Sequence, residues 1–146
     1  MSLGVVIEFY TDGAYSSARK AGGIGIVIVK NGVKVYEHSK TYYDTTNNKC
    51  ELLAVITALH SISKPVDQII IHSDSQYVIG CATMGWKRKK NVDLWNLYDK
   101  VYEKASSYCS DITFSWVKGH DKSGTFNNEM NNLADKLAVD ASHVIL

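Results

Sequence analysis

The sequence has few cysteines, almost no net charge and no long apolar run, and each scarcity excludes a class of protein. Its three cysteines, Cys50, Cys81 and Cys109, are an odd number at wide spacing and form no Cys-x-x-Cys pair. They indicate neither a disulfide framework nor a zinc site, and they favour a reducing compartment, so we expect a cytoplasmic protein. No basic segment followed by a long apolar stretch opens the chain, so the sequence predicts no secretion signal and no membrane span.

The charge balance by itself does not indicate a nucleic-acid ligand. Lys and Arg together number 16 and Asp and Glu number 15, which gives a formal net charge of +1. Proteins that bind a polyanion usually carry a more basic surface. The one basic run is Lys87-Arg88-Lys89-Lys90. From its charge alone, this run is as compatible with a solvated loop as with a contact to a polyanion.

The length of 146 residues suits one domain with a sizeable core. We expect a single domain over residues 1–146, with flexible ends at residues 1–4 and 142–146. No internal repeat, low-complexity segment or linker divides the chain.

Hydrophobic patterning predicts an α/β fold with a mixed five-stranded sheet flanked by helices. Strands are expected over residues 5–11, 23–29, 33–43, 68–73 and 112–117. Helices are expected over residues 47–65, 75–82, 92–107 and 127–140. The Asn31-Gly32 pair predicts a tight hairpin, so the first three strands should be antiparallel. The last two strands follow helical crossovers and should run parallel to the first.

Four acidic residues lie in four separate local patterns. Asp12 and Asp74 are expected at the ends of neighbouring parallel strands, which places both at one edge of the sheet. Taken singly, Asp12 could form a turn, Asp74 could cap a helix and Asp135 could lie on a solvated helix face. Glu51 is harder to explain, because it is expected near the inward face of its helix, where an unpaired carboxylate is costly. A cation is therefore expected near Glu51.

In this order, the four acidic patterns closely resemble the type 1 ribonuclease H family, over about residues 5–141. The resemblance implies the ribonuclease H-like fold and an endonuclease that hydrolyses the RNA strand of RNA/DNA hybrids, leaving 5′-phosphate and 3′-hydroxyl ends. It also implies two Mg²⁺ or Mn²⁺ ions per site, for which carboxylate oxygens are suitable ligands. The implied metal ligands are Asp12, Glu51, Asp74 and Asp135.

Each carboxylate has an implied place between the two ions. Asp12 would bridge both ions, and Asp135 would complete the ion that orients the attacking water. Glu51 and Asp74 would complete the ion near the departing 3′ oxygen. These assignments follow from the resemblance and not from the spacing of the residues.

His120 follows Trp116-Val117-Lys118-Gly119, a segment that resembles the histidine loop of the family. The resemblance implies a catalytic role for His120 in handling a proton near the attacking water, or in releasing product and metal. A lone loop histidine is otherwise usually a surface residue. Fifteen positions separate His120 from Asp135, more than in many relatives, and Glu129 lies in this extension as an alternative ligand.

Selection of RNA paired to DNA requires contacts to 2′-hydroxyl groups and to the shape of the duplex. By resemblance, the residues that contact these hydroxyls are Asn47, Asn48 and Gln76. Thr46 and Asn91 resemble the pair that holds a DNA phosphate. Any of them could instead cap a helix, and Thr46 or Asn47 is expected to do so. Asp44 stands where many bacterial relatives carry an arginine, which should weaken the phosphate pocket.

Only residues 79–90 separate the Gln76-Tyr77-Val78 segment from Asn91. This is too short for the long basic helix and loop of many bacterial relatives, so the chain resembles a bacterial or phage type that lacks the full basic protrusion. Lys87, Lys89 and the rest of the basic run would supply a reduced version, with Trp86 packed against a DNA sugar. We expect the protein to be a monomer that binds an RNA/DNA hybrid and no membrane.

Two other functions fit parts of this pattern. One is a module that binds hybrids or double-stranded RNA and has lost catalysis. The complete acidic set argues against this module, because clustered negative charge does not help a surface to bind phosphates. The other is the nuclease domain of a reverse transcriptase, or a nuclease of the same fold that acts on DNA junctions. The chain length and the matches at Asn47, Asn48 and Gln76 favour a separate hybrid nuclease.

Overall fold

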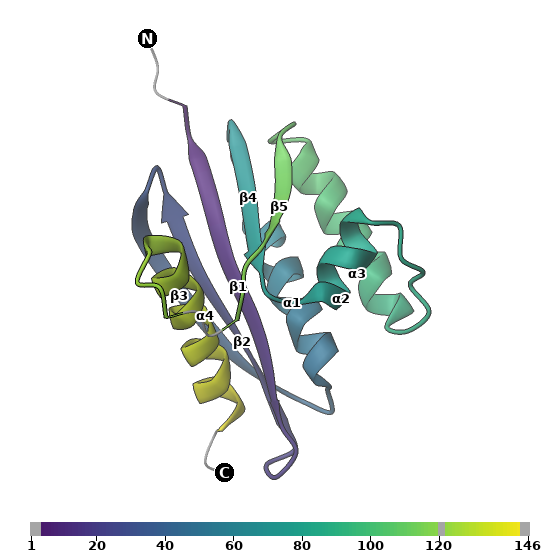
Figure 1. Cartoon of the computed structure of the whole chain (residues 1–146). Helices are drawn as coiled ribbons and strands as arrows, with labels where there is room; N and C mark the ends of the chain where they lie inside the picture. The colour runs from purple at the N-terminus through teal and green to yellow at the C-terminus, as the bar shows by residue number, and fades with distance from the viewer. Residues whose placement is uncertain (1–3, 120–121, 144–146) are drawn as a thin grey trace.

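A computed structural model describes residues 4–119 and 122–143 of the chain. A five-stranded sheet with the strand order β3-β2-β1-β4-β5 forms its centre (Figure 1). The strands are β1 (Val6–Ser16), β2 (Ala21–Lys30), β3 (Val33–Tyr43), β4 (Gln68–Ser73) and β5 (Ile112–Trp116). The helices are α1 (Asn47–His60), α2 (Gln76–Thr83), α3 (Val92–Ser106) and α4 (Phe126–Ser142).

The sheet has the predicted mixed topology. β1 pairs with β2, and β2 with β3, in antiparallel fashion, whereas β4 is parallel to β1 and β5 is parallel to β4. Asn31 and Gly32 both have positive φ, at 49° and 82°, as a tight hairpin between twisted strands requires. The expected mixed five-stranded sheet is therefore confirmed, with the first three strands antiparallel and the last two parallel to β1.

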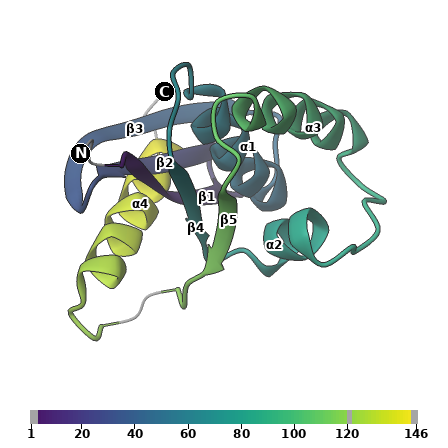
Figure 2. The same cartoon turned by 90° about the horizontal axis from the view of Figure 1, so that it is seen from above.

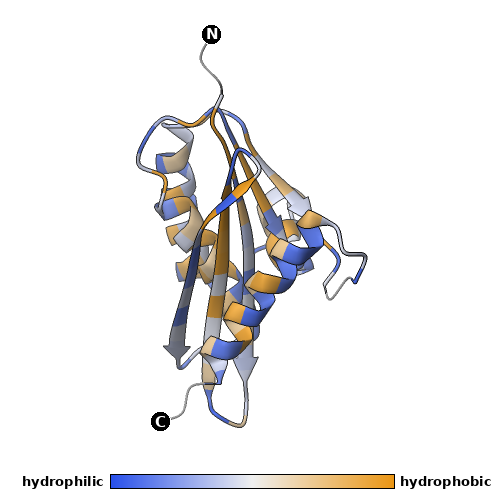
Figure 3. Cartoon of the chain, turned by 90° about the vertical axis from the view of Figure 1, so that its left-hand side faces the viewer, coloured by the Kyte–Doolittle hydropathy of each residue, from blue (hydrophilic) through white to orange (hydrophobic). Residues whose placement is uncertain are grey.

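Helices cover both faces of the sheet, with α4 on one face and α1, α2 and α3 on the other (Figure 2). The larger core lies between the sheet and α1 and α3, where Leu52, Leu59 and Ile71 are fully buried. A smaller core lies under α4, where Ala134 packs with Tyr10. Figure 3 shows hydrophobic colour along the central strands and alternating polar and hydrophobic colour along α4, as expected for an amphipathic helix on a sheet.

Several element boundaries differ from the sequence prediction, and three of these differences concern how the elements pack. β1 continues past Asp12 to Ser16, because its second half remains paired with β2 in a long hairpin. α1 ends at His60, before Pro65, and α4 extends to Ser142, whose side chain is buried. Ser142 is therefore part of a packed helix and not of a flexible end. Most of the expected flexible ends, residues 1–3 and 144–146, lie outside the described residues.

All three cysteines are buried free thiols, in agreement with the absence of a predicted disulfide framework. Cys50 lies in α1, Cys81 lies in α2, and Cys109 follows α3. Among the described residues, no helix is long and apolar enough to cross a membrane.

Candidate metal centre and nucleic-acid interface

The register of the parallel strands brings Asp12 and Asp74 together. Thr11 of β1 is paired with Ser73 of β4, and this is the last parallel pair between the two strands. Asp12 and Asp74 are the next residue on each strand, so both leave the paired region at the same level. Asp12 does not end its strand as the sequence analysis expected, but it does lie where β1 loses its parallel neighbour.

Gly13 allows the first turn of α1 to approach β1 closely. A Cβ atom at Gly13 would overlap the backbone of Cys50 and Glu51, so only glycine fits this contact. The backbone N–H of Gly13 donates a hydrogen bond of 2.9 Å to Oε1 of Glu51. The sequence Asp12-Gly13 thus supplies one acidic side chain and the space for a second.

Asp135 reaches the same place from the opposite face of the sheet. The register pairs Asp12 with Gly25 of β2, and a Cβ atom at Gly25 would overlap the backbone of α4 at Ala134. The missing side chain lets α4 rest directly on the strand, immediately before Asp135. The Asp135 side chain is close enough to Asp12 to contribute to the raised pKa of Asp12.

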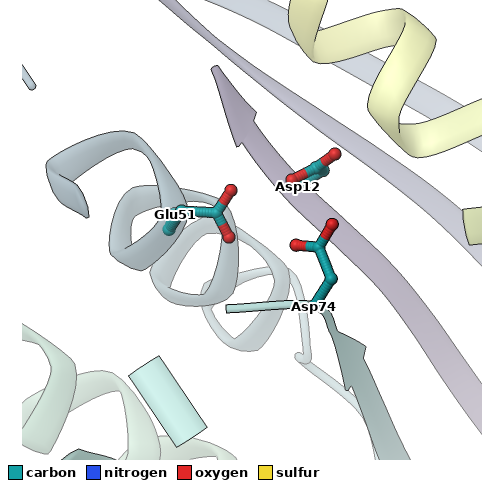
Figure 4. Close-up of side chains that lie close together, drawn as sticks. All are labelled: Asp12, Glu51 and Asp74. Carbon is teal, nitrogen blue, oxygen red and sulfur yellow. The ribbon is translucent and has the colours of Figure 1, made fainter. Parts of the chain in front are cut away.

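The acidic side chains form one cluster. Figure 4 shows the carboxylates of Asp12, Glu51 and Asp74 pointing toward one another from β1, α1 and the end of β4. One ligand oxygen from each lies within 4.8 Å of the others. These acids and Asp135 line a pocket of about 360 Å³. All four predicted acidic ligands therefore face one cavity, although only three form the tightest group among the described residues.

Two of these acids, Asp12 and Glu51, are buried, and no cation among the described residues forms an ion pair with either of them. Burial, together with the charges of Glu51 and Asp74, raises the pKa of Asp12 far above its ordinary value. Burial also raises the pKa of Glu51 to about 7, although the hydrogen bond from Gly13 lowers it. Oε2 of Glu51 is buried and receives no hydrogen bond from the described residues. A cation bound among these carboxylates would stabilise their ionised forms and provide a partner for Oε2 of Glu51.

The ordinary explanations of Asp12 and Asp74 do not hold in the fold. Asp12 lies within a continuous strand and forms no turn. The cap of α2 is Ser75, whose side chain accepts a hydrogen bond from the N–H of Val78, so Asp74 is not the cap. The predicted cap of α1 is confirmed at Thr46, which accepts from the N–H of Lys49 at 3.1 Å.

The residues expected to contact 2′-hydroxyl groups lie beside the acids. Asn47, Asn48 and Gln76 line the same 360 Å³ pocket as the four carboxylates. Ser75 and Tyr77 also line it, and the sequence analysis did not select them. Their adjacency to Asp74 and Gln76 in the chain was the only signal that could have identified them.

A second pocket, of about 510 Å³, contains the residue expected to help hold a DNA phosphate. Asn91 lies there and donates from Nδ2 to the Tyr77 hydroxyl at 3.0 Å, and it makes no side-chain capping bond to α3. Thr46 does not line this pocket, whereas Thr45 and Lys49 do. Lys49 is a cation that sequence analysis missed. Asp44 and Asp93 also line the pocket, and their negative charges oppose phosphate binding.

The segment with the basic run lies beyond α2. Trp86 is 49% exposed, and the side chains of Lys87, Lys89 and Lys90 are exposed. Arg88 is turned toward α3 and forms an ion pair with Asp99. The structure thus divides the basic run, which the sequence analysis treated as one group.

The histidine expected to handle protons cannot be placed in this site, because His120 lies outside the described residues. Gly119 is described, and a Cβ atom there would come within 3.0 Å of a carboxylate oxygen of Asp74. Residue 119 therefore borders the acidic cluster. Glu129, the alternative ligand, is exposed in the first turn of α4 and does not line the acidic pocket.

Comparison with known proteins gives consistent matches over almost the whole chain. The sequence model of the family described as RNase H matches residues 5–143. A ribonuclease H of Trichodesmium erythraeum is 39% identical over 145 residues, which cover 93% of this chain and 88% of that protein. A ribonuclease HI of Synechocystis is 34% identical, with coverage of 92% and 86%.

Solved structures show the same fold. RNase H1 of the archaeon Halobacterium salinarum superposes with a TM-score of 0.73 at 27% identity, covering 93% of this chain and 96% of that one. A structure of LC11-RNase H1 in complex with an RNA/DNA hybrid has a TM-score of 0.68 at 22% identity, with coverage of 93% and 94%. At that identity, the likeness to the second structure concerns the fold alone.

Proposed function

Because this chain belongs to the ribonuclease H family, we propose that its acidic pocket is the catalytic site of an endonuclease specific for the RNA strand of RNA/DNA hybrids. The observation that carries the proposal is the convergence of Asp12, Glu51, Asp74 and Asp135 on one pocket lined also by amide side chains. The products would carry 5′-phosphate and 3′-hydroxyl ends.

The donor set fits hard divalent cations. The cluster offers carboxylate oxygens only, two of its acids are buried, and an oxygen of Glu51 has no hydrogen-bond partner among the described residues. Mg²⁺ or Mn²⁺ accept such ligands, and a pair of these ions, when bound, would stabilise charge on both the attacking and the departing oxygen. We assign Asp12 as the ligand shared by two ions. Asp135 would serve the ion on the water side, and Glu51 and Asp74 the other.

The protein's own groups would orient the RNA strand over this pocket. Asn47 and Asn48 in the first turn of α1 and Gln76 in the first turn of α2 flank the acids and carry amide donors and acceptors. Such groups can bond 2′-hydroxyls in the minor groove, which DNA does not present. We assign Asn91, with Thr46 or its pocket neighbour Thr45, to a phosphate of the DNA strand. His120 is assigned to proton handling at the attacking water or to product release.

The deciding experiment compares labelled RNA/DNA, RNA/RNA and DNA/DNA duplexes, each incubated with and without Mg²⁺ or Mn²⁺. We expect internal cleavage of RNA in the hybrid only, and only with metal, with ends that carry 5′-phosphate and 3′-hydroxyl groups. Binding of the hybrid without cleavage would instead identify a catalytically inactive module. Cleavage of DNA duplexes or branched DNA would contradict the assigned specificity.

A further inference from the structure

Arg88 differs from the three other members of the basic run in the contacts it makes. Its Nη1 lies 2.8 and 3.0 Å from the two carboxylate oxygens of Asp99 on α3. Its Nε donates to the carbonyl oxygen of Cys81 in α2 at 3.3 Å. One side chain therefore joins the segment after α2 to both α2 and α3.

The Arg88 guanidinium also lies over two aromatic rings of α3. Its Cζ is 4.4 Å from the centroid of the Trp95 ring and 5.5 Å from that of Tyr98. Both rings are buried, and Trp95 is fixed by a hydrogen bond from its Nε1 to the Tyr77 hydroxyl at 2.9 Å. A stacked guanidinium whose charge already faces a carboxylate is poorly placed to bind a phosphate.

Trp86, two residues before Arg88, is seated on α2. A Cβ atom at Gly80 would overlap the Trp86 ring, and the N–H of Trp86 donates to the carbonyl oxygen of Gly80 at 3.3 Å. The ring borders an apolar groove of about 270 Å³. The groove is lined by Gln76, Ile79, Met84, Trp86 and Trp116. Gln76 also lines the acidic pocket, so the groove and the acidic pocket adjoin at this residue.

We propose that Arg88 is a positioning residue, which holds residues 84–90 as a preformed arm for the hybrid substrate and does not itself contact nucleic acid. This inference rests on the proposed function. The arm presents the exposed Trp86 ring to the groove and the cations of Lys87, Lys89 and Lys90 to the solvent. Because Arg88 orders the arm before substrate arrives, binding does not carry the entropic cost of ordering a loop.

Asp99→Asn gives a test in which electrostatics and positioning predict opposite results. The substitution removes a negative charge near the arm, so simple electrostatics predicts tighter binding of a polyanion. If Asp99 holds Arg88, the arm loosens and the hybrid should bind about three- to tenfold more weakly. Glu103→Gln is the matched control, since it makes the same charge change at an exposed position one turn later on α3. It should leave the dissociation constant within about twofold of its starting value.

Arg88→Lys tests the same contact while keeping the charge. An ammonium has one nitrogen, so it cannot bond Asp99 and the Cys81 carbonyl from two separate positions as Nη1 and Nε of Arg88 do, and it has no plane to stack on Trp95. Positioning therefore predicts a loss of affinity close to that of Asp99→Asn. In cleavage assays, both variants should raise KM and leave kcat of the saturated enzyme unchanged. Unchanged or tighter binding by Asp99→Asn, or unchanged binding by Arg88→Lys, would overturn the proposal.

Binding is best measured in an Asp12→Asn background, where the hybrid should stay intact, and cleavage in the otherwise wild-type protein. If the wild-type protein cuts no hybrid, the proposed function fails whatever the arm does. If it cuts hybrid and the arm variants bind as tightly as Glu103→Gln, only the positioning role of Arg88 fails. Thermal unfolding of each variant excludes general loss of the fold.

Discussion

Two acidic residues of β1, Glu8 and Asp12, differ in how the protein compensates their charge. Glu8 and Asp12 both point to one face of β1, four residues apart. Oε1 of Glu8 lies 2.9 Å from Nε2 of His72, which stacks on Tyr10, so this acid has a partner. Asp12 is surrounded by other acids, and its pKa is raised. Glu8 is thus supported by a side chain of the neighbouring strand β4, whereas Asp12 requires an external cation.

The largest expected difference between Asp12 and Glu8 is in the rate of hybrid cleavage after each is replaced by its amide. Asp12→Asn should reduce hybrid cleavage by about a thousandfold or more, because a bound metal contributes several kcal/mol to transition-state stabilisation. Glu8→Gln, which leaves the cluster unchanged, should cleave at close to the wild-type rate. Single-turnover cleavage of a labelled hybrid measures both. A similar loss in both variants would show that the two places are not functionally distinct.

A smaller loss is expected when proton handling is removed and the metal ligands are kept. His120→Ala should retain partial activity, about 10²- to 10⁴-fold below wild type, since general acid–base catalysis contributes in that range. The pH dependence of kcat should change in this variant, because histidine is the side chain whose ordinary pKa lies between pH 5 and 8. Complete loss of cleavage in both His120→Ala and Asp12→Asn would contradict the separate roles of the two residues.

Substitutions of Asp12 and Glu8 should also change the melting temperature in opposite directions when a chelator is present. Because the pKa of Asp12 is raised on folding, the folded protein binds more protons than the unfolded chain above about pH 4, and stability falls as pH rises. Glu51 adds to this fall toward its pKa of about 7. At pH 8, Asp12→Asn should therefore raise Tm by about 5 °C. Glu8→Ala should lower Tm, because it leaves the buried His72 ring without its partner, at a cost of about 1–3 kcal/mol.

Thermal unfolding from pH 5 to pH 8, with and without Mg²⁺ or Mn²⁺, checks these signs. The gain from Asp12→Asn should shrink at pH 5, where both Asp12 and Glu51 are protonated in the folded wild type. Metal should stabilise the wild type more than the variant. The effect of Glu8→Ala should depend little on metal. A lower Tm for Asp12→Asn in chelator at pH 8 would contradict the unfavourable burial of Asp12.

The smallest expected effect concerns exposed charge that is remote from either acid. Replacing Lys87, Lys89 and Lys90 by alanine should weaken hybrid binding, and the slope of affinity against salt should fall by about one unit for each phosphate that a lysine no longer neutralises. KM should rise while kcat stays nearly constant. Fluorescence anisotropy between low and physiological salt measures the slope. An unchanged affinity and slope would show that these lysines belong to a solvated loop.

Much of the site could be predicted from local sequence because each acid is placed by its own element. Asp74 follows a short strand, and Glu51 lies in the first turn of a helix whose cap, Thr46, was also predicted. Parallel pairing of β1 and β4 then fixes the level of Asp12 and Asp74. These relations depend on strand register and helix start, which residue patterns encode well.

The parts that could not be predicted depend on contacts between distant segments. The end of β1 was placed too early, because the continued pairing with the glycines of β2 carries little hydrophobic signal. The inward turn of Arg88 depends on Asp99 and on two rings of α3, and nothing in a run of four cations distinguishes it. The close packing of α4 on β2 likewise depends on Gly25, and this contact involves a helix more than 100 residues later in the chain.

The three buried thiols, Cys50, Cys81 and Cys109, can report transient opening of the structure around them. Cys50 directly precedes Glu51 and packs between Gly22 and Thr45, whereas Cys109 lies beyond α3. A buried thiol reacts with a modifying reagent only when its surroundings open transiently, so its reaction rate measures that opening. A cation that draws the acids together should therefore slow the labelling of Cys50 and leave that of Cys109 unchanged. The labelling rates of the native cysteines could then report the closing of the site without an introduced probe.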